Sequence, residues 1–261
     1  MIELHEVAYA HGGALLLDGI DAALVPGELT VIIGPNGAGK STLLQCMARG
    51  IQPTHGRVAF AGRPLAGFSW RELARRRAVL SQQIELPFPQ RAADVVRLAR
   101  VAHAAAAHED ERIVLHALRR AGVQHLAERD IQTLSGGERQ RVHIARVLAQ
   151  LWESLEASQP ALLLLDEPVS ALDLLHQHEL LTLLRELTPR GLTVCCVLHD
   201  LNLAALFADT IWVLKAGRLH ARGGRDDIVQ AELLSAVYGL PLLTLPHPAL
   251  AERRIVAFAD A

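Results

Sequence analysis

Cysteine and aromatic residues are scarce in this sequence. Three cysteines occur in 261 residues, and two of them, Cys195 and Cys196, are adjacent, so a disulfide framework is excluded and a reducing compartment is expected. Aromatic residues make up 4% of the chain and are spread along it, which argues against a stacking platform for single-stranded nucleic acid. The net charge of -2 and the pI near 6.7 also give no support to a nucleic-acid binder.

Long hydrophobic runs are absent as well. No stretch reaches about 18 uninterrupted apolar residues, and the first ten residues lack a charged region followed by an apolar one. We therefore expect a soluble, cytoplasmic protein whose only membrane contact comes through a partner. With 51% hydrophobic and 21% charged residues, the composition is that of a globular α/β domain or of a core with a smaller lobe.

Short apolar runs and helical patterns alternate along the chain, which predicts a mostly parallel, buried sheet. Between residues 87 and 149 alanine, leucine and arginine dominate with a spacing near 3.6, and this segment is predicted to be a helical lobe inserted in the core. A further helical pattern runs from Asp226 to Tyr238. The predicted strands are 2–7, 15–24, 29–33, 57–60, 78–81, 162–165, 192–198 and 211–214.

A glycine-rich segment follows the predicted strand 29–33 and precedes a helical pattern. It matches the phosphate-loop pattern G-x-x-x-x-G-K-[ST]. Its glycines let backbone N–H groups turn toward phosphate oxygens at the positive end of a helix dipole. The Lys40 ammonium would reach the β- and γ-phosphates, and the Ser41 hydroxyl would ligate Mg²⁺. The predicted ATP-binding residues are Gly34, Pro35, Asn36, Gly37, Ala38, Gly39, Lys40, Ser41 and Thr42.

Two adjacent carboxylates, Asp166 and Glu167, end the apolar run 162–165. Ligands bind at the carboxyl ends of parallel strands, where the phosphate loop also lies. Asp166 suits work on Mg²⁺, directly or through another ligand, and Glu167 suits the base that polarises water. Alternatively, the two carboxylates cap a helix after Pro168.

The segment Leu134-Ser135-Gly136-Gly137-Glu138 lies too far along the chain to belong to the phosphate loop. Ser-Gly-Gly before a helix, here predicted over 139–151, is a second helix start suited to an anion. An ordinary helix cap has the same composition, so the segment gains its meaning from its combination with the other two motifs.

The order of these motifs resembles that of the ATP-binding-cassette (ABC) ATPases. The phosphate loop, LSGGERQR, LLLLDEP, SALD and a histidine at a strand end follow one another as in that family, over about residues 1–240. The resemblance implies a P-loop ATPase core with a mostly parallel sheet, an N-terminal antiparallel β subdomain and an inserted α-helical lobe. Its ABC domain spans 1–240, with the lobe at about 87–149, and a tail of 241–261 follows.

The resemblance also implies a head-to-tail homodimer with two ATP molecules between the subunits. The signature Leu134, Ser135, Gly136, Gly137 and Glu138 closes on the γ-phosphate of the opposite subunit, and Asp173 resembles the loop aspartate that couples the two sites. Tyr9 resembles the aromatic residue that stacks on adenine. Alternatively, its ring only packs against neighbouring side chains of the protein.

Three residues carry the hydrolytic roles that the resemblance implies. His199 resembles the histidine that contacts the γ-phosphate, although a helix-start or core histidine is the ordinary reading. Gln82 resembles the glutamine that touches Mg²⁺ and the attacking water and senses the permease, with neighbouring Gln83 as the other candidate and a solvated loop residue as the alternative. The expected catalytic residues are Glu167, His199 and Gln82, and the expected Mg²⁺ ligands are Ser41, Gln82 and Asp166.

Within the family, the chain looks like the importer branch that serves metal-chelate cargo, and most like ATPase subunits that import haem. The segment 81–89, the extra stretch 151–160 and the segment 170–178 carry this resemblance. It implies two transmembrane permease subunits, a substrate-binding protein that acts through them, and a peripheral location at the cytoplasmic face of the bacterial inner membrane. Cobalamin and ferric siderophores are alternative cargoes.

Two other functions are weighed against transport. A soluble ABC ATPase that remodels a macromolecular assembly would retain the nucleotide motifs, whereas a haem-binding or storage protein would leave them unexplained. Thirteen histidines suggest direct metal or haem binding. However, His176 and His178 are two residues apart and do not share a helix face, so packed or solvated histidines are expected.

Overall fold

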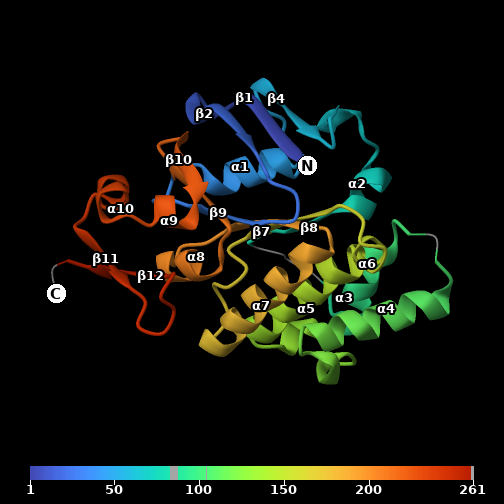
Figure 1. The fold of residues 1–261 in the computed structure, drawn as a ribbon. Coiled ribbons are helices and arrows are strands. Elements are labelled where there is room, and N and C mark those ends of the chain that lie inside the picture. The colour runs from blue at the N-terminus through green and yellow to red at the C-terminus, as the bar shows by residue number, and fades with distance from the viewer. Residues whose placement is uncertain (83–87, 104, 260–261) are drawn as a thin grey trace. The chain divides into compact units, whose positions relative to one another are not determined.

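The computed structural model describes residues 1–82, 88–103 and 105–259, and Gln83 lies outside them. The chain folds as two compact units, one of residues 1–67 with 193–261 and one of residues 68–192. Figure 1 colours the chain by residue number, so the first unit is seen in blue and orange-red, and the second runs from cyan through green to yellow-orange. Each unit is described by itself below.

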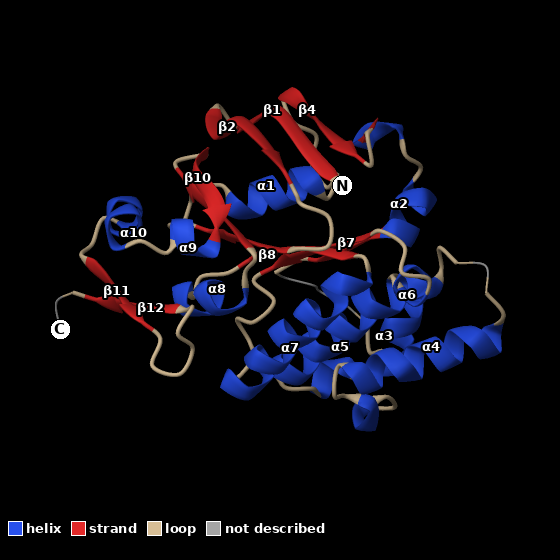
Figure 2. Ribbon diagram, in the orientation of Figure 1, coloured by secondary structure: helices blue, strands red, loops and turns tan. Residues whose placement is uncertain are grey.

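The first unit begins with an antiparallel sheet in the order β2-β1-β4-β5. Strand β1 pairs with β2 and β4 (Figure 2), and its side chains Ile2, Leu4 and Val7 are buried. The strands are β1 (Ile2–His11), β2 (Ala14–Ala23), β4 (His55–Phe60) and β5 (Arg63–Pro64). This is the antiparallel N-terminal part that the family resemblance predicts.

The same unit holds the parallel strands that lead to the phosphate loop. Strand β3 (Leu29–Ile33) lies between β8 (Leu192–Val197) and β9 (Thr210–Lys215) and is parallel to both. All five residues of β3 and all six of β8 are buried, as expected of parallel strands covered on both faces. Strand β10 (Arg218–Gly224) returns antiparallel to β9 through a turn at Ala216 and Gly217.

Helices and a small hairpin complete the first unit. Its helices are α1 (Lys40–Met47), α8 (Leu201–Phe207), α9 (Arg225–Ile228) and α10 (Ala231–Tyr238). The single helix expected over 226–238 is wrong, because Gln230 has an extended backbone and its side chain donates to the Asp226 carbonyl at 2.6 Å. Strands β11 (Leu242–Pro246) and β12 (Arg254–Phe258) form a hairpin beside α8, where Asn202 bonds both backbone polar groups of Val256.

The second unit combines a parallel strand pair with a group of helices. Strand β6 (Arg77–Leu80) is parallel to β7 (Ala161–Asp166). Helices α3, α4 and α5 pack on one another (Figure 1). The unit's helices are α2 (Trp70–Arg76), α3 (Ala92–Arg97), α4 (Ala107–Arg120), α5 (Gly136–Gln150), α6 (Trp152–Glu156) and α7 (Leu174–Leu187).

These parallel and antiparallel pairings confirm the predicted α/β fold class, while the domain limits 1–240 and 241–261 stay predictions.

A buried ion-pair network connects α6 to the other helices of the second unit. Arg100, whose side chain is 1% exposed, donates to Asp110 at 2.8 Å, to the Ala149 carbonyl at 2.8 Å and to both carboxylate oxygens of Glu153. Burial of the guanidinium and its hydrogen bonds to both carboxylates act on it together, and the net effect raises the pKa of Arg100.

Candidate nucleotide-binding and hydrolysis site

The glycine-rich loop adopts a backbone that only glycine can supply at two of its positions. Gly34 has φ +146, and a Cβ built there would lie 2.1 Å from the carbonyl oxygen of Leu214. Gly39 has φ +96, and its Cβ would lie 2.7 Å from the carbonyl oxygen of Leu16. Larger residues would force the loop away from β9 and β2, so the sequence pattern has a direct steric cause here.

Lys40 is buried at the first position of α1, and its ammonium points back into the loop. Its Nζ donates to the carbonyl oxygen of Gly34 at 2.8 Å and to that of Pro35 at 2.9 Å. The loop therefore curls around this positive charge, next to the amino end of α1, which carries no acidic residue in its first turn. Ser41 and Thr42 follow in that turn, half-buried. This arrangement suits phosphate oxygens.

Tyr9 is on β1, and the neighbouring strand β2 lies between it and the phosphate loop. It pairs with Leu17 across the β1–β2 ladder, and a Cβ on Gly39 would lie 2.9 Å from the Cδ2 atom of Leu17. His199 follows β8, whose end lies beside the end of β3, because the Leu198 N–H donates to the Ile32 carbonyl at 3.2 Å. His199 is exposed and precedes Asp200, which caps α8.

In the second unit, Gln82 and Glu167 come together at the ends of β6 and β7. The Gln82 Nε2 donates to Glu167 Oε2 at 2.9 Å. Asp166 is the last residue of β7 and is 3% exposed, whereas Glu167 follows it with φ +50, a left-handed backbone that non-glycine residues rarely adopt. The two adjacent carboxylates thus project from one strand end in different environments.

The alternative in which these carboxylates cap a helix is wrong. A turn occupies 168–172, and α7 begins at Leu174 with Asp173 as its cap. The Ser170 hydroxyl donates to the Glu167 carbonyl at 3.0 Å. Gln140 from α5 and Gln177 from α7 donate to the carbonyls of Pro168, Val169 and Leu172. The sequence prediction did not include these supporting residues, whose only signal is their place within the LSGGERQR segment and the segment 170–178.

The signature segment forms the start of α5. The helix begins at Gly136 rather than at the expected Arg139, because Ser135 caps it and makes a reciprocal pair of bonds with Glu138. The bond from the Ser135 backbone N–H lowers the pKa of Glu138. A Cβ on Gly137 would lie 3.0 Å from the Ala171 carbonyl, so the signature packs closely against the turn that carries Asp173.

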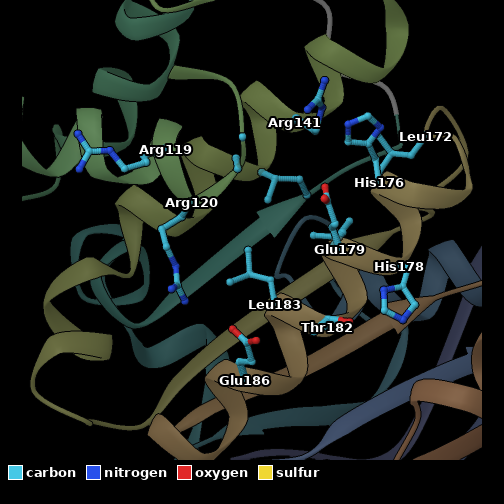
Figure 3. A pocket seen from close by; sticks show the side chains of 14 residues that line it. Arg119, Arg120, Arg141, Leu172, His176, His178, Glu179, Thr182, Leu183 and Glu186 are labelled. Atoms are coloured by element: carbon cyan, nitrogen blue, oxygen red, sulfur yellow. The ribbon is translucent and has the colours of Figure 1, made fainter. Parts of the chain in front are cut away.

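Asp173 holds the amino end of α7. Its Oδ1 accepts from the His176 backbone N–H at 2.9 Å and lies 2.7 Å from His176 Nδ1. The backbone bond is the main cause that lowers the pKa of Asp173. Next to His176 lies a pocket of about 480 Å³ between α4, α5 and α7 (Figure 3). Arginines and glutamates share its lining, and it contains none of the predicted catalytic residues.

The predicted Mg²⁺ ligands are divided between the two units. Ser41 belongs to the first unit, whereas Gln82 and Asp166 belong to the second. Hydroxyl, amide and carboxylate oxygens are the donors that Mg²⁺ prefers, so the residue types fit the ion. Among the described residues, no three or more histidine, cysteine, aspartate or glutamate side chains gather in a way that could hold a metal. The ligand set stays a prediction.

The described helices include none that is long and apolar enough to cross a membrane.

The comparisons identify relatives along the whole chain. The family profile described as "ABC transporter" matches residues 17–170. The chain is 44% identical to the hemin import ATP-binding protein HmuV of Gloeobacter violaceus, over 100% of this chain and 95% of the relative. It is 46% identical to the protein of the same name from Hahella chejuensis, over 95% of this chain and 96% of the relative.

Solved structures agree with these relatives. A structure assigned to an inward-facing metal-chelate type ABC transporter superimposes with a TM-score of 0.81 at 26% identity, covering 98% of this chain and 96% of that one. The dimeric structure of a bacterial ABC transporter cassette gives a TM-score of 0.77 at 29% identity, covering 86% and 99%. The chain therefore belongs to the ABC transporter family, as one of its ATP-binding, ATP-hydrolysing cassettes.

Proposed function

We propose that this chain is the ATPase subunit of a haem importer. The observation that carries the proposal is the identity of 43–46% with eight relatives named hemin import ATP-binding protein. In seven of them the match covers more than nine tenths of the relative's length. Cobalamin and ferric siderophores are the alternative cargoes that the experiment separates.

The chain acts on ATP through the residues that the motifs predict. The loop 34–42 holds the phosphates, with Lys40 neutralising their charge and Ser41, Gln82 and Asp166 offering oxygens to Mg²⁺. Mg²⁺ supplies charge neutralisation on the phosphates. Glu167 orients and activates the attacking water, held by its bond from Gln82 at 2.9 Å, and His199 contacts the γ-phosphate. Tyr9 stacks on the base.

Hydrolysis is coupled to transport through assembly. Two copies associate head to tail, so that the signature of one copy, Leu134 to Glu138, closes on the γ-phosphate bound by the other, and Asp173 couples the two sites. The pair works beneath two permease subunits at the cytoplasmic face of the inner membrane, and a binding protein delivers cargo to the permease. In this arrangement the ATPase touches no cargo.

The second unit has a groove of about 700 Å³ that suits a protein partner. The groove lies between α2, the segment after α3, and α5. Trp70 and Val101 on its rim are 60% and 78% exposed, although both are large and apolar. Apolar side chains gathered on a groove mark an interaction surface. We place the cytoplasmic segment of the permease there, since the permease is the partner that the family requires.

The test is ATPase activity of the chain co-purified with its permease and reconstituted in lipid. Binding proteins loaded with haem, cobalamin or a ferric siderophore are added in turn, with the empty binding proteins as controls. We expect stimulation by haem alone. Stimulation by another chelate keeps the transport role and changes the cargo, whereas a chain that retains no permease contradicts the transport role.

The groove is tested by Trp70→Glu, which should reduce the amount of permease that co-purifies with the chain.

A further inference from the structure

We propose that His11 is a second wall of the nucleobase site, so that the base of ATP is held between the rings of Tyr9 and His11. This inference rests on the proposed nucleotide role of Tyr9 and the phosphate loop. It assigns a substrate-binding function to a histidine that the motif pattern leaves unused.

The two rings have the geometry of an open clamp. Tyr9 and His11 are two residues apart on β1, and their ring planes differ by 10° with centroids 6.4 Å apart. Bases stacked in a duplex lie about 3.4 Å apart, so a base between two flat rings needs about 6.8 Å. The centroid separation is the upper limit of the gap between the ring faces and is a few tenths of an ångström short of that, so the two side chains must rotate apart to admit a base.

The clamp lies at the correct end of the strand for a bound nucleotide. Tyr9 pairs with Leu17, which together with Leu16 surrounds Gly39 of the phosphate loop. His11 pairs with Ala14, two residues farther along β1 toward the turn at Gly12 and Gly13. A nucleotide whose phosphates lie in the loop therefore reaches Tyr9 first, with His11 on the outer side of the base.

The approach to the clamp is open. His11 is exposed and Tyr9 is half-buried. The turn that follows consists of Gly12 and Gly13 with φ +58 and +81, and no atom lies within 4 Å of a Cβ built on either residue. Two glycines with positive φ make a tight hairpin turn without side chains. No side chain of this turn covers the ring faces.

Stacking between a base and an aromatic side chain is strong and tolerates different bases. A clamp with two rings therefore increases the affinity for the whole nucleotide without touching the phosphates. The imidazole of His11 then acts in substrate binding, and the affinity for a triphosphate without a base is independent of it. This difference gives the test its readout.

The experiment measures dissociation constants by calorimetry for MgATP and for Mg-tripolyphosphate, which lacks the base. The full chain is compared with His11→Ala, His11→Phe and Tyr9→Leu. We expect His11→Ala to weaken MgATP binding at least fivefold, as loss of one stacking face predicts, and His11→Phe to stay within about twofold of the original chain. Binding of Mg-tripolyphosphate should be the same in all four proteins.

A matched control is His55→Ala, which removes another exposed histidine from the same antiparallel sheet, on β4. It should bind both ligands like the original chain. Unchanged MgATP affinity in His11→Ala or in Tyr9→Leu overturns the clamp, and so does an equal loss of MgATP and tripolyphosphate binding. If the original chain binds no tripolyphosphate, the proposed role of the phosphate loop itself fails.

Discussion

Glu167 combines a proposed catalytic carboxylate with an uncommon backbone. Its φ of +50 costs on the order of 1 kcal/mol for a residue with a side chain, and the bonds from Ser170 to its carbonyl and from Gln82 to its carboxylate hold it in place. Local strain kept at one position by its neighbours is typical of a site where the direction of a side chain matters. The direction of the carboxylate is thus fixed both by the backbone of Glu167 and by the hydrogen bond to its side chain.

We expect Glu167→Gln to bind ATP with unchanged affinity and to lose hydrolysis by at least about a hundredfold. Glutamine has the same shape and can keep the backbone conformation, but it cannot take a proton from water. Equilibrium binding of MgATP and steady-state phosphate release measure the two effects. Substantial turnover in this variant would contradict the role of Glu167, and lost affinity would indicate a misfolded loop.

At this scale, motif spacing selected the candidate residues but not the contacts that hold them. Gly34 and Gly39 show positive φ and close backbone contacts, which is why the loop pattern demands glycine. The left-handed backbone of Glu167 has no signal in the sequence, because it depends on a turn fixed by Gln140 and Gln177 from two helices.

Helix α5 shows how an element can be predicted while its boundary is missed. Glycine has low helix propensity, which favoured a start after Gly137, yet the reciprocal bonds between Ser135 and Glu138 bring both glycines into the first turn. The Ser-x-x-Glu spacing was visible in the sequence and is the signal that gives the observed boundary. Nothing local, by contrast, signals that α5 buries a histidine.

His143 of α5 predicts a pH dependence of stability. It is 3% exposed, and within the described part of the chain its ring nitrogens have no hydrogen-bond partner. Burial, with Arg146 and Arg139 nearby, lowers the pKa of His143 to about 4. The unfolded chain, with an ordinary pKa near 6.5, therefore binds more protons between these values, so the free energy of unfolding falls as the pH drops from about 6.5 to about 4.

The measurement is denaturant unfolding of the chain and of His143→Leu at pH 7 and pH 5. Between these values the original chain should lose about 2 kcal/mol more than the variant. Leucine is the suitable replacement because it fills the buried site without a titratable group. Parallel losses in the two proteins would show that His143 is not the group responsible.

For the whole molecule, alternation of strands and helices predicted the class of fold but not its strand order. The central position of β3 between β8 and β9 joins residues about 160 to 180 positions apart, and no local pattern encodes such pairings. The hairpin of β11 and β12 was also missed. Its strands are short and half-exposed, and Asn202 of α8 contributes to fixing their place.

The discontinuous first unit has a consequence for synthesis on the ribosome. Strand β3 and the phosphate loop emerge early, but their neighbours β8 and β9 are translated only after the whole continuous second unit. At about 5–20 residues per second, the nascent β3 waits for several seconds to tens of seconds with its apolar edges unpaired. This interval is a window for chaperone binding.

Ribosome-stalled chains of increasing length can measure the order of folding. We expect protease protection of residues 68–192 in shorter nascent chains than protection of residues 29–47. The latter should appear only once β9 has left the exit tunnel. Protection of the phosphate-loop segment before that length would contradict the order. In this order of folding the cassette forms from its middle outward, and the proposed phosphate loop acquires its neighbouring strands only after the second unit has folded.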